Sequence, residues 1–365
     1  MSTAPDLPQV ISQRLDTFVA AQRRDAAAWG DEATLLVDAG AAALRGGKRL
    51  RARFCVTGWR AVAAAGGGPT QQIPDAVLDT AAALEVFHAA ALVHDDIIDN
   101  SDTRRGHPAA HKALESHHTD AGWDGDPSAF GRSGAILLGD LLVAWSDDLL
   151  EAGLAALAPP RAARTRTEYA TMRREVTVGQ FLDVAEESTW TTQPDDTHAA
   201  RALRVAELKS ARYSILQPLL IGAALAGADE TQTAALAAFG TPVGLAFQVR
   251  DDVLGVFGDT HQTGKPSGDD LREGKRTVLI AYAREALEPG PRRLMDEMLG
   301  DPDLEPDQIA ALQRTIIDTG ALDRVETLIS DWARQADRAL SGARLDNTSV
   351  GQLRDLARAA TVRST

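Results

Sequence analysis

Two acidic clusters, each at the end of an apolar run with helical spacing, most constrain how this chain can fold. The first reads DDIID at 95–99, and the second reads DDVLG at 251–255. On a helix, carboxylates four positions apart lie on one face about a turn apart, where their charges repel. Cations between the clusters would remove that repulsion. We therefore expect two helices whose acidic ends face each other and hold divalent metals that bridge an anionic ligand, most simply a diphosphate.

The rest of the chain favours an all-α fold. Aromatic residues make up 5% of the sequence, apolar residues recur at helical spacing, and alternating β-branched runs are scarce. The breaks between helix-length segments are short, at 66–69, 158–160, 191–196 and 258–268, and a polar stretch at 116–133 is predicted to be a surface loop. Because no long linker divides the chain, one domain is predicted, with peripheral termini at about 1–8 and 346–365.

Charge and cysteine content exclude several classes of protein. The net charge of −14 argues against nonspecific nucleic-acid binding. A single cysteine, Cys55, cannot form an intrachain disulfide, which predicts a reducing compartment. The N-terminus does not have the basic start and apolar core of a signal peptide, and the apolar run Ile215–Gly227 is too short to cross a bilayer. The chain is predicted to be cytoplasmic, with no transmembrane segment.

The lysines indicate where an anionic substrate binds. The chain has 38 Lys and Arg residues, of which five are lysines, and four of these five lie in motif-like strings. The strings are GGKRLR with Lys48, ELKSARYS with Lys209, TGKP with Lys265 and REGKRT with Lys275. Because an ammonium group binds phosphate as a point charge, these lysines are candidate diphosphate ligands.

The first acidic cluster ends a run from Thr80 to Asp99 that contains neither Pro nor Gly, so a continuous helix is predicted. At 100° per residue, His88, Asp95 and Asp99 fall within about 40° of one another. His88 is thus either a satisfied core residue or a ligand-binding group. The arginines that follow, Arg104 and Arg105, could neutralise the carboxylates, reach phosphate oxygens, or do both.

The second cluster lacks a third carboxylate, because Gly255 stands where the first cluster has Asp99. Fewer protein ligands would suit Mg²⁺, which keeps several waters and uses substrate phosphates. Gln248 lies one turn before Asp252 and can orient a metal-bound water. Asp259 lies about 80° round the helix from Asp251, if the helix continues so far. Beyond it, a Gly- and Pro-containing loop carries a lysine at either end that could close over the site.

These motifs together resemble the trans-isoprenyl diphosphate synthases of the polyprenyl synthetase family, most closely the geranylgeranyl diphosphate synthases. They are GGKRLR, EVFHAAALVHDDIIDNSDTRRG, GQFLD, KSARYS, FQVRDDVLG and GKPSGDDLREGKRT, in family order from residue 46 to 277. The resemblance implies a single-domain antiparallel bundle of helices around a deep central cavity, and a homodimer. It also implies a Mg²⁺-dependent prenyltransferase of isoprenoid biosynthesis, which joins isopentenyl diphosphate head-to-tail to an allylic diphosphate.

The resemblance assigns roles to individual residues. The positions that match those holding the diphosphate of isopentenyl diphosphate are Lys48, Arg51, His88 and Arg105. The positions that match direct Mg²⁺ ligands are Asp95, Asp99 and Asp251, with Asp96 and Asp252 in support. Those that match groups gripping the allylic diphosphate are Arg104, Lys209 and Lys265, with Lys275 in support. Pocket positions that orient water or stabilise charge around it are Gln180, Asp183, Tyr213 and Gln248, and Ser210 stands where Thr is usual.

The implied chemistry fits this set of residues. About three Mg²⁺ ions and several cationic side chains would stabilise the diphosphate as it leaves. Water must be kept from the allylic cation, which suits a pocket lined by Ala and Leu.

Product length is expected to depend on the helix before Asp95. Ala90 and Ala91 lie about 6–8 Å below Asp95 and Phe87 about 12 Å below it, at ~1.5 Å per residue. In the resembled family, bulky residues four or five positions before the first Asp stop chain growth, and both positions are Ala in this chain. The growing tail would pass the alanines and meet Phe87, which predicts a C20 product.

Several alternatives remain open from the sequence. The product could be C15, or C25 and longer. A terpene cyclase would share the fold but would not need an isopentenyl diphosphate site, which Lys48, Arg51 and His88 indicate. A non-catalytic partner subunit is a further alternative, although the first acidic motif is complete.

Overall fold

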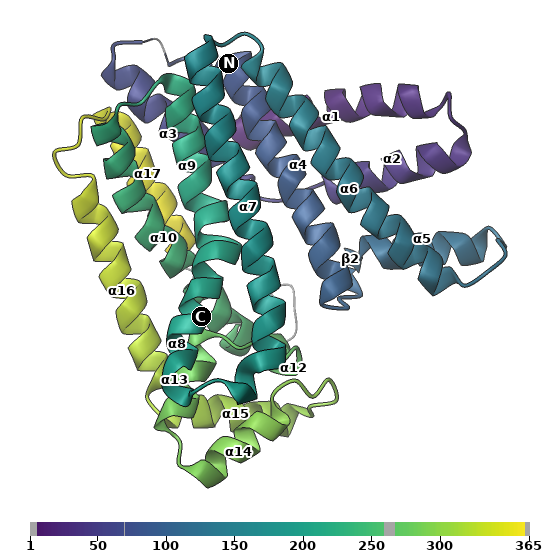
Figure 1. The fold of residues 1–365 in the computed structure, drawn as a ribbon, viewed down its shortest axis with the longest axis vertical. Coiled ribbons are helices and arrows are strands. Elements are labelled where there is room, and N and C mark those ends of the chain that lie inside the picture. The colour runs from purple at the N-terminus through teal and green to yellow at the C-terminus, as the bar shows by residue number, and fades with distance from the viewer. Residues whose placement is uncertain (1–5, 69, 259–266, 362–365) are drawn as a thin grey trace. The chain divides into compact units, whose positions relative to one another are not determined.

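The computed structural model describes residues 6–68, 70–258 and 267–361, and it is helical almost throughout (Figure 1). Among these residues there are two strands, each two residues long, and they pair to form one hairpin. The predicted all-α fold is confirmed. The chain divides into two compact units, Met1–Val56 with Pro69–Ala163, and Thr57–Gly68 with Arg164–Thr365. The single domain stays a prediction.

The first unit contains the first acidic cluster and the N-terminal helices. Its elements are α1 (Leu7–Ala26), α2 (Asp31–Ala43), the start of α3 (Leu50–Ala65), α4 (Asp75–Ile98), β1 (Thr103–Arg104), β2 (His107–Pro108), α5 (Ala110–Asp120), α6 (Pro127–Leu154) and the start of α7 (Pro159–Thr189).

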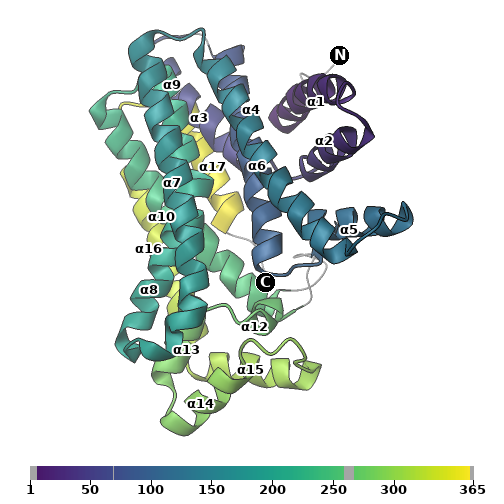
Figure 2. The ribbon, with the colours of Figure 1, turned by 45° about the vertical axis from the view of Figure 1, so that its right-hand side comes forward.

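Helix α4 is the core of this unit and packs along α6 (Figure 2). Two glycines of α6 allow the close approach. A Cβ at Gly153 would lie 2.9 Å from the carbonyl oxygen of Ala76, and one at Gly139 would overlap the ring of His94. Because these contacts pair the end of one helix with the start of the other, α4 and α6 run antiparallel. The Ser146 hydroxyl donates to the carbonyl of Ala83 at 3.1 Å between them.

The second unit contains the second acidic cluster. Its elements are the rest of α3 and α7, the 3₁₀ turns η1 (Trp190–Thr192) and η2 (Asp195–Thr197), α8 (His198–Val205), the π-helix η3 (Ala206–Leu216), α9 (Gln217–Ala226), α10 (Glu230–Phe257), α12 (Asp269–Arg272), α13 (Val278–Ala286), α14 (Pro289–Met298), α15 (Pro306–Asp318), α16 (Ala321–Ala339) and α17 (Asn347–Thr361).

Helix α10 organises the second unit. Val249 and Val253 are fully buried and belong to a core that includes Leu279 and Val325. A capping box at Asp229 begins the helix. Near the other end, the guanidinium of Arg250 makes two hydrogen bonds, of 2.5 and 2.6 Å, to the carboxylate of Glu326 on α16. These contacts fix the end of α10 that carries the second acidic cluster.

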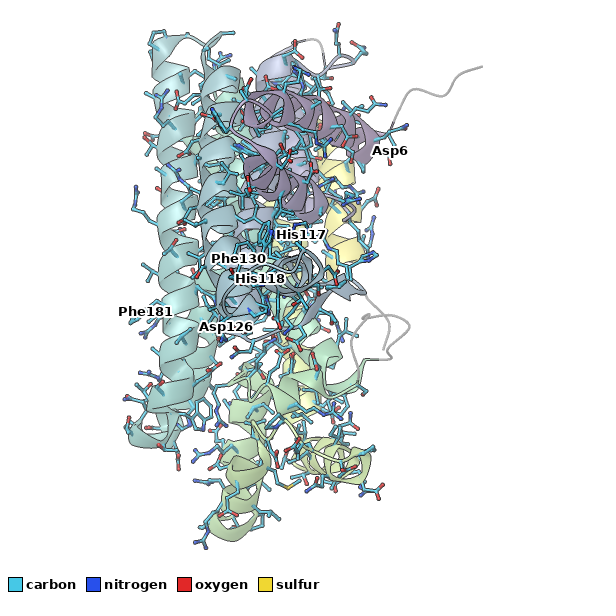
Figure 3. All side chains as sticks on the ribbon, turned by 90° about the vertical axis from the view of Figure 1, so that its right-hand side faces the viewer. Asp6, His117, His118, Asp126, Phe130 and Phe181 are labelled. Carbon is cyan, nitrogen blue, oxygen red and sulfur yellow. The ribbon has the colours of Figure 1, made fainter. Side chains whose placement is uncertain are left out.

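Two predictions about the chain's organisation were wrong. The polar stretch 116–133 is mostly helical, because α5 continues to Asp120 and α6 begins at Pro127. His118 is 3% exposed at this corner, and its ring lies near Trp123 and Phe130; Figure 3 shows His118 and Phe130 close together. The stretch beyond 346 is not peripheral either. It forms α17, which buries Leu353 and accepts a hydrogen bond from Arg250 at the carbonyl of Thr361.

Among the described residues, one helix has the length and hydropathy that could cross a bilayer, and it is α4. About two-thirds of its apolar window, 67%, is buried inside the protein, as expected for a core helix.

Candidate functional site

Helix α4 carries the first acidic cluster to its C-terminal end, as predicted. The helix runs from Asp75 to Ile98, and Asp99 caps it with φ −85° and ψ 0°. Asp95 and Asp99 are half-buried and Asp96 is 3% exposed. Burial raises the pKa of Asp96, and the hydrogen bond from Arg104 opposes that rise. The carboxylates therefore lie at a helix end where a cation can compensate them.

A tight hairpin places the two arginines that follow the cluster. Strands β1 and β2 pair antiparallel, with Arg104 opposite His107. The two loop residues, Arg105 and Gly106, have φ of +54° and +76°, as in a type I′ turn. A non-glycine residue rarely adopts this backbone, so the arginine at this position carries a local conformational cost.

The two arginine side chains point to different partners. The Arg104 Nε donates to Asp96 Oδ1 at 2.8 Å, and its Nη2 lies 3.9 Å from Asp95 Oδ2. The Arg105 Nη1 donates to the carbonyl of Arg45 at 3.0 Å. A Cβ on Gly47 would lie 3.3 Å from Arg105 Nη2, so the guanidinium packs against the second glycine of the GGKRLR motif. Arg104 neutralises the acidic cluster, whereas Arg105 lies at the predicted isopentenyl diphosphate site.

His88 is the centre of a cationic group in the first unit. Its pKa is lowered well below the ordinary value, first by burial and then by the charges of Arg51, Arg105, Arg104 and Arg49. The ring is therefore neutral at physiological pH, and its surroundings are strongly positive. An anion such as a diphosphate would relieve this repulsion. Three of the four residues predicted to hold isopentenyl diphosphate, Arg51, His88 and Arg105, thus lie together, and Lys48 is exposed nearby in sequence.

A buried carboxylate that sequence reasoning missed, that of Glu85, lies among these cations. Glu85 is 4% exposed, and its Oε1 accepts from the backbone N–H of Ala52 at 3.0 Å, in the first turn of α3. Its Oε2 lies 3.8 Å from Arg49 Nη1. Arg49 is 7% exposed, has φ +51°, and also donates to the carbonyl of Leu44 at 2.8 Å. Glu85 thus ties the loop with Lys48 and the helix turn with Arg51 to α4, one turn before His88.

In the second unit, an 11-residue π-helix, η3, carries the KSARYS motif. π-Helical turns are rare and are frequent at functional sites. Lys209 lies on η3, and its Nζ donates to Asp183 Oδ2 on α7 at 2.5 Å. A Cβ on Gly179 of the GQFLD motif would lie 2.3 Å from the backbone N of Lys209. The two motifs are therefore in direct contact, and the glycine is required for that contact.

The other predicted residues of η3 and α7 lie near this pair. Ser210 and Gln180 are half-buried, and Tyr213 is 5% exposed. Glu187, one turn after Asp183, has its pKa raised first by burial and then by the charge of Asp183. The sequence predicted the chemistry of these residues but contained no signal for a π-helix.

The second acidic cluster lies on α10. Gln248 Nε2 donates to Asp252 Oδ1 at 2.7 Å, which confirms that they face the same way. The pKa of Asp252 is raised to about 8, first by burial and then by the charge of Asp270, while Gln248 and Lys275 oppose the rise. A cation beside this carboxyl group would stabilise its charged form and lower its pKa. Lys275 Nζ lies 3.2 Å from Asp270 Oδ1 and 2.7 Å from Glu273 Oε2.

The predicted closing loop is described from residue 267 onward. Lys265 and Asp259 lie outside the described residues. The later part of the loop is ordered by α12 and by glycines at φ +76° (Gly268) and +73° (Gly274).

The carboxylate oxygens of each acidic cluster, taken by itself, are the kind of donor that a hard divalent cation such as Mg²⁺ prefers. Within residues 6–68, 70–258 and 267–361, no three or more Asp, Glu, His or Cys side chains converge as a metal site by themselves. The cage predicted to join Asp95, Asp99 and Asp251 stays a prediction.

Residues 34–316 match a family model described as polyprenyl synthetase. A crystal structure of geranylgeranyl pyrophosphate synthase from Corynebacterium glutamicum, complexed with isoprenyl diphosphate and magnesium, is similar at a TM-score of 0.90 and 39% identity, and the match covers 98% of this chain and 99% of that one.

Two curated relatives are also similar. A geranylfarnesyl diphosphate synthase from Aeropyrum pernix is 32% identical over 300 residues, which cover 81% of this chain and 83% of the relative. A heptaprenyl diphosphate synthase component 2 from Geobacillus stearothermophilus is 32% identical over 318 residues, which cover 86% of this chain and 84% of the relative.

We predict that Glu85 holds the anion-binding corner of the first unit together. Glu85→Ala should lower the free energy of unfolding by about 3 kcal/mol, because Arg49 would stay buried without its counter-charge. Urea unfolding followed by circular dichroism measures this change. Asp75→Asn, on the same helix as Glu85, is the control: it removes the exposed ion pair between Asp75, 82% exposed, and Arg14 on α1, and should cost no more than about 0.5 kcal/mol. Equal costs for the two variants would contradict a structural role for Glu85.

Proposed function

This chain belongs to the polyprenyl synthetase family and is a prenyltransferase, and from this premise we propose that its main product is C20 geranylgeranyl diphosphate. The reaction is the head-to-tail joining of isopentenyl diphosphate to an allylic diphosphate, with all-trans product geometry. The observation that carries the site assignment is the group of four arginines around His88, beside the first acidic cluster. Such a concentration of cations in a chain of net charge −14 is suited to an anionic substrate.

We assign the His88 group to isopentenyl diphosphate. Arg51 and Arg105 can donate bidentately to phosphate oxygens, and Lys48 adds a mobile point charge. Neutral His88 can donate one hydrogen bond without adding charge. The family resemblance of the sequence motifs implies the same role for these four residues, which supports the proposal.

We assign the allylic diphosphate to the two acidic clusters and to four cationic side chains. The proposed metal ligands are Asp95, Asp99 and Asp251, supported by Asp96 and Asp252. About three Mg²⁺ ions, when bound, would neutralise the diphosphate and stabilise it as a leaving group. Arg104, Lys209, Lys265 and Lys275 would share that charge. Lys209 is paired with Asp183 in the structure, so Asp183 holds the ammonium in place for the substrate.

The proposed bond changes balance without a further catalytic base. The bond from C1 of the allylic group to its diphosphate oxygen breaks, and the electron pair leaves with the diphosphate. The double bond of isopentenyl diphosphate then attacks C1, and the proton that is lost goes to the departed diphosphate. Gln180, Ser210, Tyr213 and Gln248 are proposed to orient water and stabilise charge around these groups.

The proposed C20 length rests on α4 below Asp95. Ala90 is 1% exposed and packs in the core, whereas Ala91 is half-buried and Phe87 is 7% exposed. This agrees with the helical angles, which turn Ala91 toward the carboxylate face. A tail would pass the small side chain of Ala91 and stop at Phe87.

Product analysis tests the proposed activity and its C20 length. Purified protein with Mg²⁺, radiolabelled isopentenyl diphosphate and each of dimethylallyl, geranyl and farnesyl diphosphate should give mainly geranylgeraniol after dephosphorylation and chromatography. Mainly C15, or C25 and longer, would overturn the C20 length. A cyclised hydrocarbon without incorporation of label would favour a terpene cyclase.

We predict that Ala91→Phe shortens the product toward C15, because the aromatic ring would block the tail about one turn below Asp95. The same product analysis measures the change. Ala333→Phe, an exposed alanine on α16, is the matched control and should leave the product at C20. An unchanged product from the Ala91 variant would mean that this face of α4 does not line the tail pocket.

We also propose a homodimer, as the family resemblance implies. Helix α7 exposes an apolar stripe of Val178, Phe181 and Val184, which are 51%, 69% and 38% exposed. Figure 3 shows Phe181 projecting outward from α7. Apolar residues so exposed at helical spacing are typical of a surface covered by a partner. A second copy of the chain is the proposed partner, and a cytoplasmic location is proposed with it.

We predict that Phe181→Asp converts the dimer to monomer, because a charge would be buried in an apolar interface. Size-exclusion chromatography with light scattering at micromolar concentration measures the mass. Leu294→Asp, at a residue 59% exposed on α14, is the control and should stay dimeric. A dimeric Phe181 variant would exclude this stripe as the interface. If wild-type protein elongates only after another chain is added, a partner subunit is favoured, as the name of the heptaprenyl relative allows.

A further inference from the structure

A cavity of about 210 Å³ lies between α1, α2 and the loop 45–49, which contains the start of the GGKRLR motif. All of these residues belong to the first unit, and Figure 2 shows α1 and α2 as neighbouring helices. The apolar part of the wall consists of Leu15, Val19, Ala41 and Leu44. A protein cavity of ~150 Å³ with a lining of this kind admits benzene. The space therefore suits a compact organic molecule with a short aliphatic part.

The polar part of the wall contains a buried cation, Arg49, which is 7% exposed. Its Nη2 donates to the carbonyl of Leu44 at 2.8 Å and to the Ser12 hydroxyl at 3.3 Å. Its Nη1 lies 3.8 Å from Glu85 Oε2, beyond hydrogen-bonding distance, and its Nε has no partner among the described residues. A buried guanidinium with unused donors favours a further acceptor, which an anionic ligand would supply.

Two further charges line the cavity where it meets solvent. Arg45 and Asp16 are exposed, and neither side chain makes an ion pair or a hydrogen bond with another described residue. Arg45 adds a second positive charge to that of Arg49, whereas the Asp16 carboxylate disfavours an anion of high charge. The lining thus favours a ligand with one negative charge. A diphosphate, for which the cations around His88 are suited, carries more.

We propose that this cavity is a second small-molecule site, which binds an aliphatic carboxylate of about five carbons. The carboxylate head would lie at Arg45 and Arg49, and the aliphatic part would lie between α1 and α2 against Leu15 and Leu44. The site is separate from the acidic clusters and contains none of the residues assigned to either diphosphate.

The loop 45–49 connects this cavity to the proposed isopentenyl diphosphate site. The carbonyl of Arg45 accepts from Arg105 Nη1 at 3.0 Å, and Gly47 packs against the same guanidinium. A ligand in the cavity would hold the loop and, through it, Arg105. Isopentenyl diphosphate should then bind more tightly, because less of the site remains to be ordered. This coupling rests on the proposed function, whereas the cavity site does not.

The test measures binding of 3-methylbutanoate to the full-length protein by ligand-observed NMR. Ala41→Phe fills the cavity and should weaken binding at least about tenfold. Ala42→Phe, at the exposed neighbouring position on α2, is the matched control and should leave the dissociation constant within about twofold of wild type.

Two exposed substitutions test the charge of the ligand without filling the cavity. Arg45→Gln should weaken binding about fivefold, and Asp16→Asn should strengthen it by about the same factor, as for exposed ion pairs. The neutral analogue 3-methylbutan-1-ol should respond to neither substitution.

The outcomes separate this site from the catalytic one. Absence of saturable binding to wild type would overturn the proposal. So would a probe that Ala41→Phe still binds normally and inorganic diphosphate displaces, since it would lie at the His88 group. Saturating probe should lower the half-saturating isopentenyl diphosphate concentration about fivefold in wild type and leave it unchanged in Ala41→Phe. No change in wild type would overturn the coupling. A protein that binds the probe in the cavity but does not bind isopentenyl diphosphate would contradict the proposed function alone.

Discussion

Repulsion between like charges is the constraint on which the charged groups of each unit depend. In the first unit four arginines raise the potential at His88, and in the second unit burial and Asp270 raise the pKa of Asp252. A diphosphate would lower the positive potential at His88, and a divalent cation would lower the pKa of Asp252.

Close approaches between neighbouring helices explain how the charged groups are held. Gly179 lets α7 contact the backbone of Lys209, and Gly139 and Gly153 let α6 pack closely along α4. At each position a methyl group would overlap atoms of the neighbouring helix. Side chains that extend from such closely packed helices have little freedom, so the lysine and carboxylate groups are placed before any ligand arrives. Preorganised charge of this kind is what stabilises a leaving group efficiently.

The parts of this structure that follow from local pattern were predictable. The helix through His88 and Asp95 could be predicted because its sequence is rich in Ala and Leu and contains no Pro or Gly. The spacing of one helical turn predicted the contact of Gln248 with Asp252. The corner at 116–133 was misread because its polar composition hides aromatic contacts around His118. The π-helix could not be read, since residue propensities do not distinguish its wider turn from an α-helix. Glu85 and Asp270 were missed because their partners are distant in sequence, and a buried carboxylate cannot be told from a solvated one before packing is known.

The π-helix has a consequence for how this sequence can evolve. An α-helix that gains one residue can absorb it as a wider turn, whereas loss of that residue would restore regular α-helix and rotate everything beyond by about 100°. Between α8 and α9, the stretch Ala206–Leu216 is therefore sensitive to length as well as to residue identity. A one-residue deletion there could leave every motif letter of KSARYS recognisable while turning Lys209 away from Asp183. Two relatives with the same letters could then differ in activity through the helical register alone.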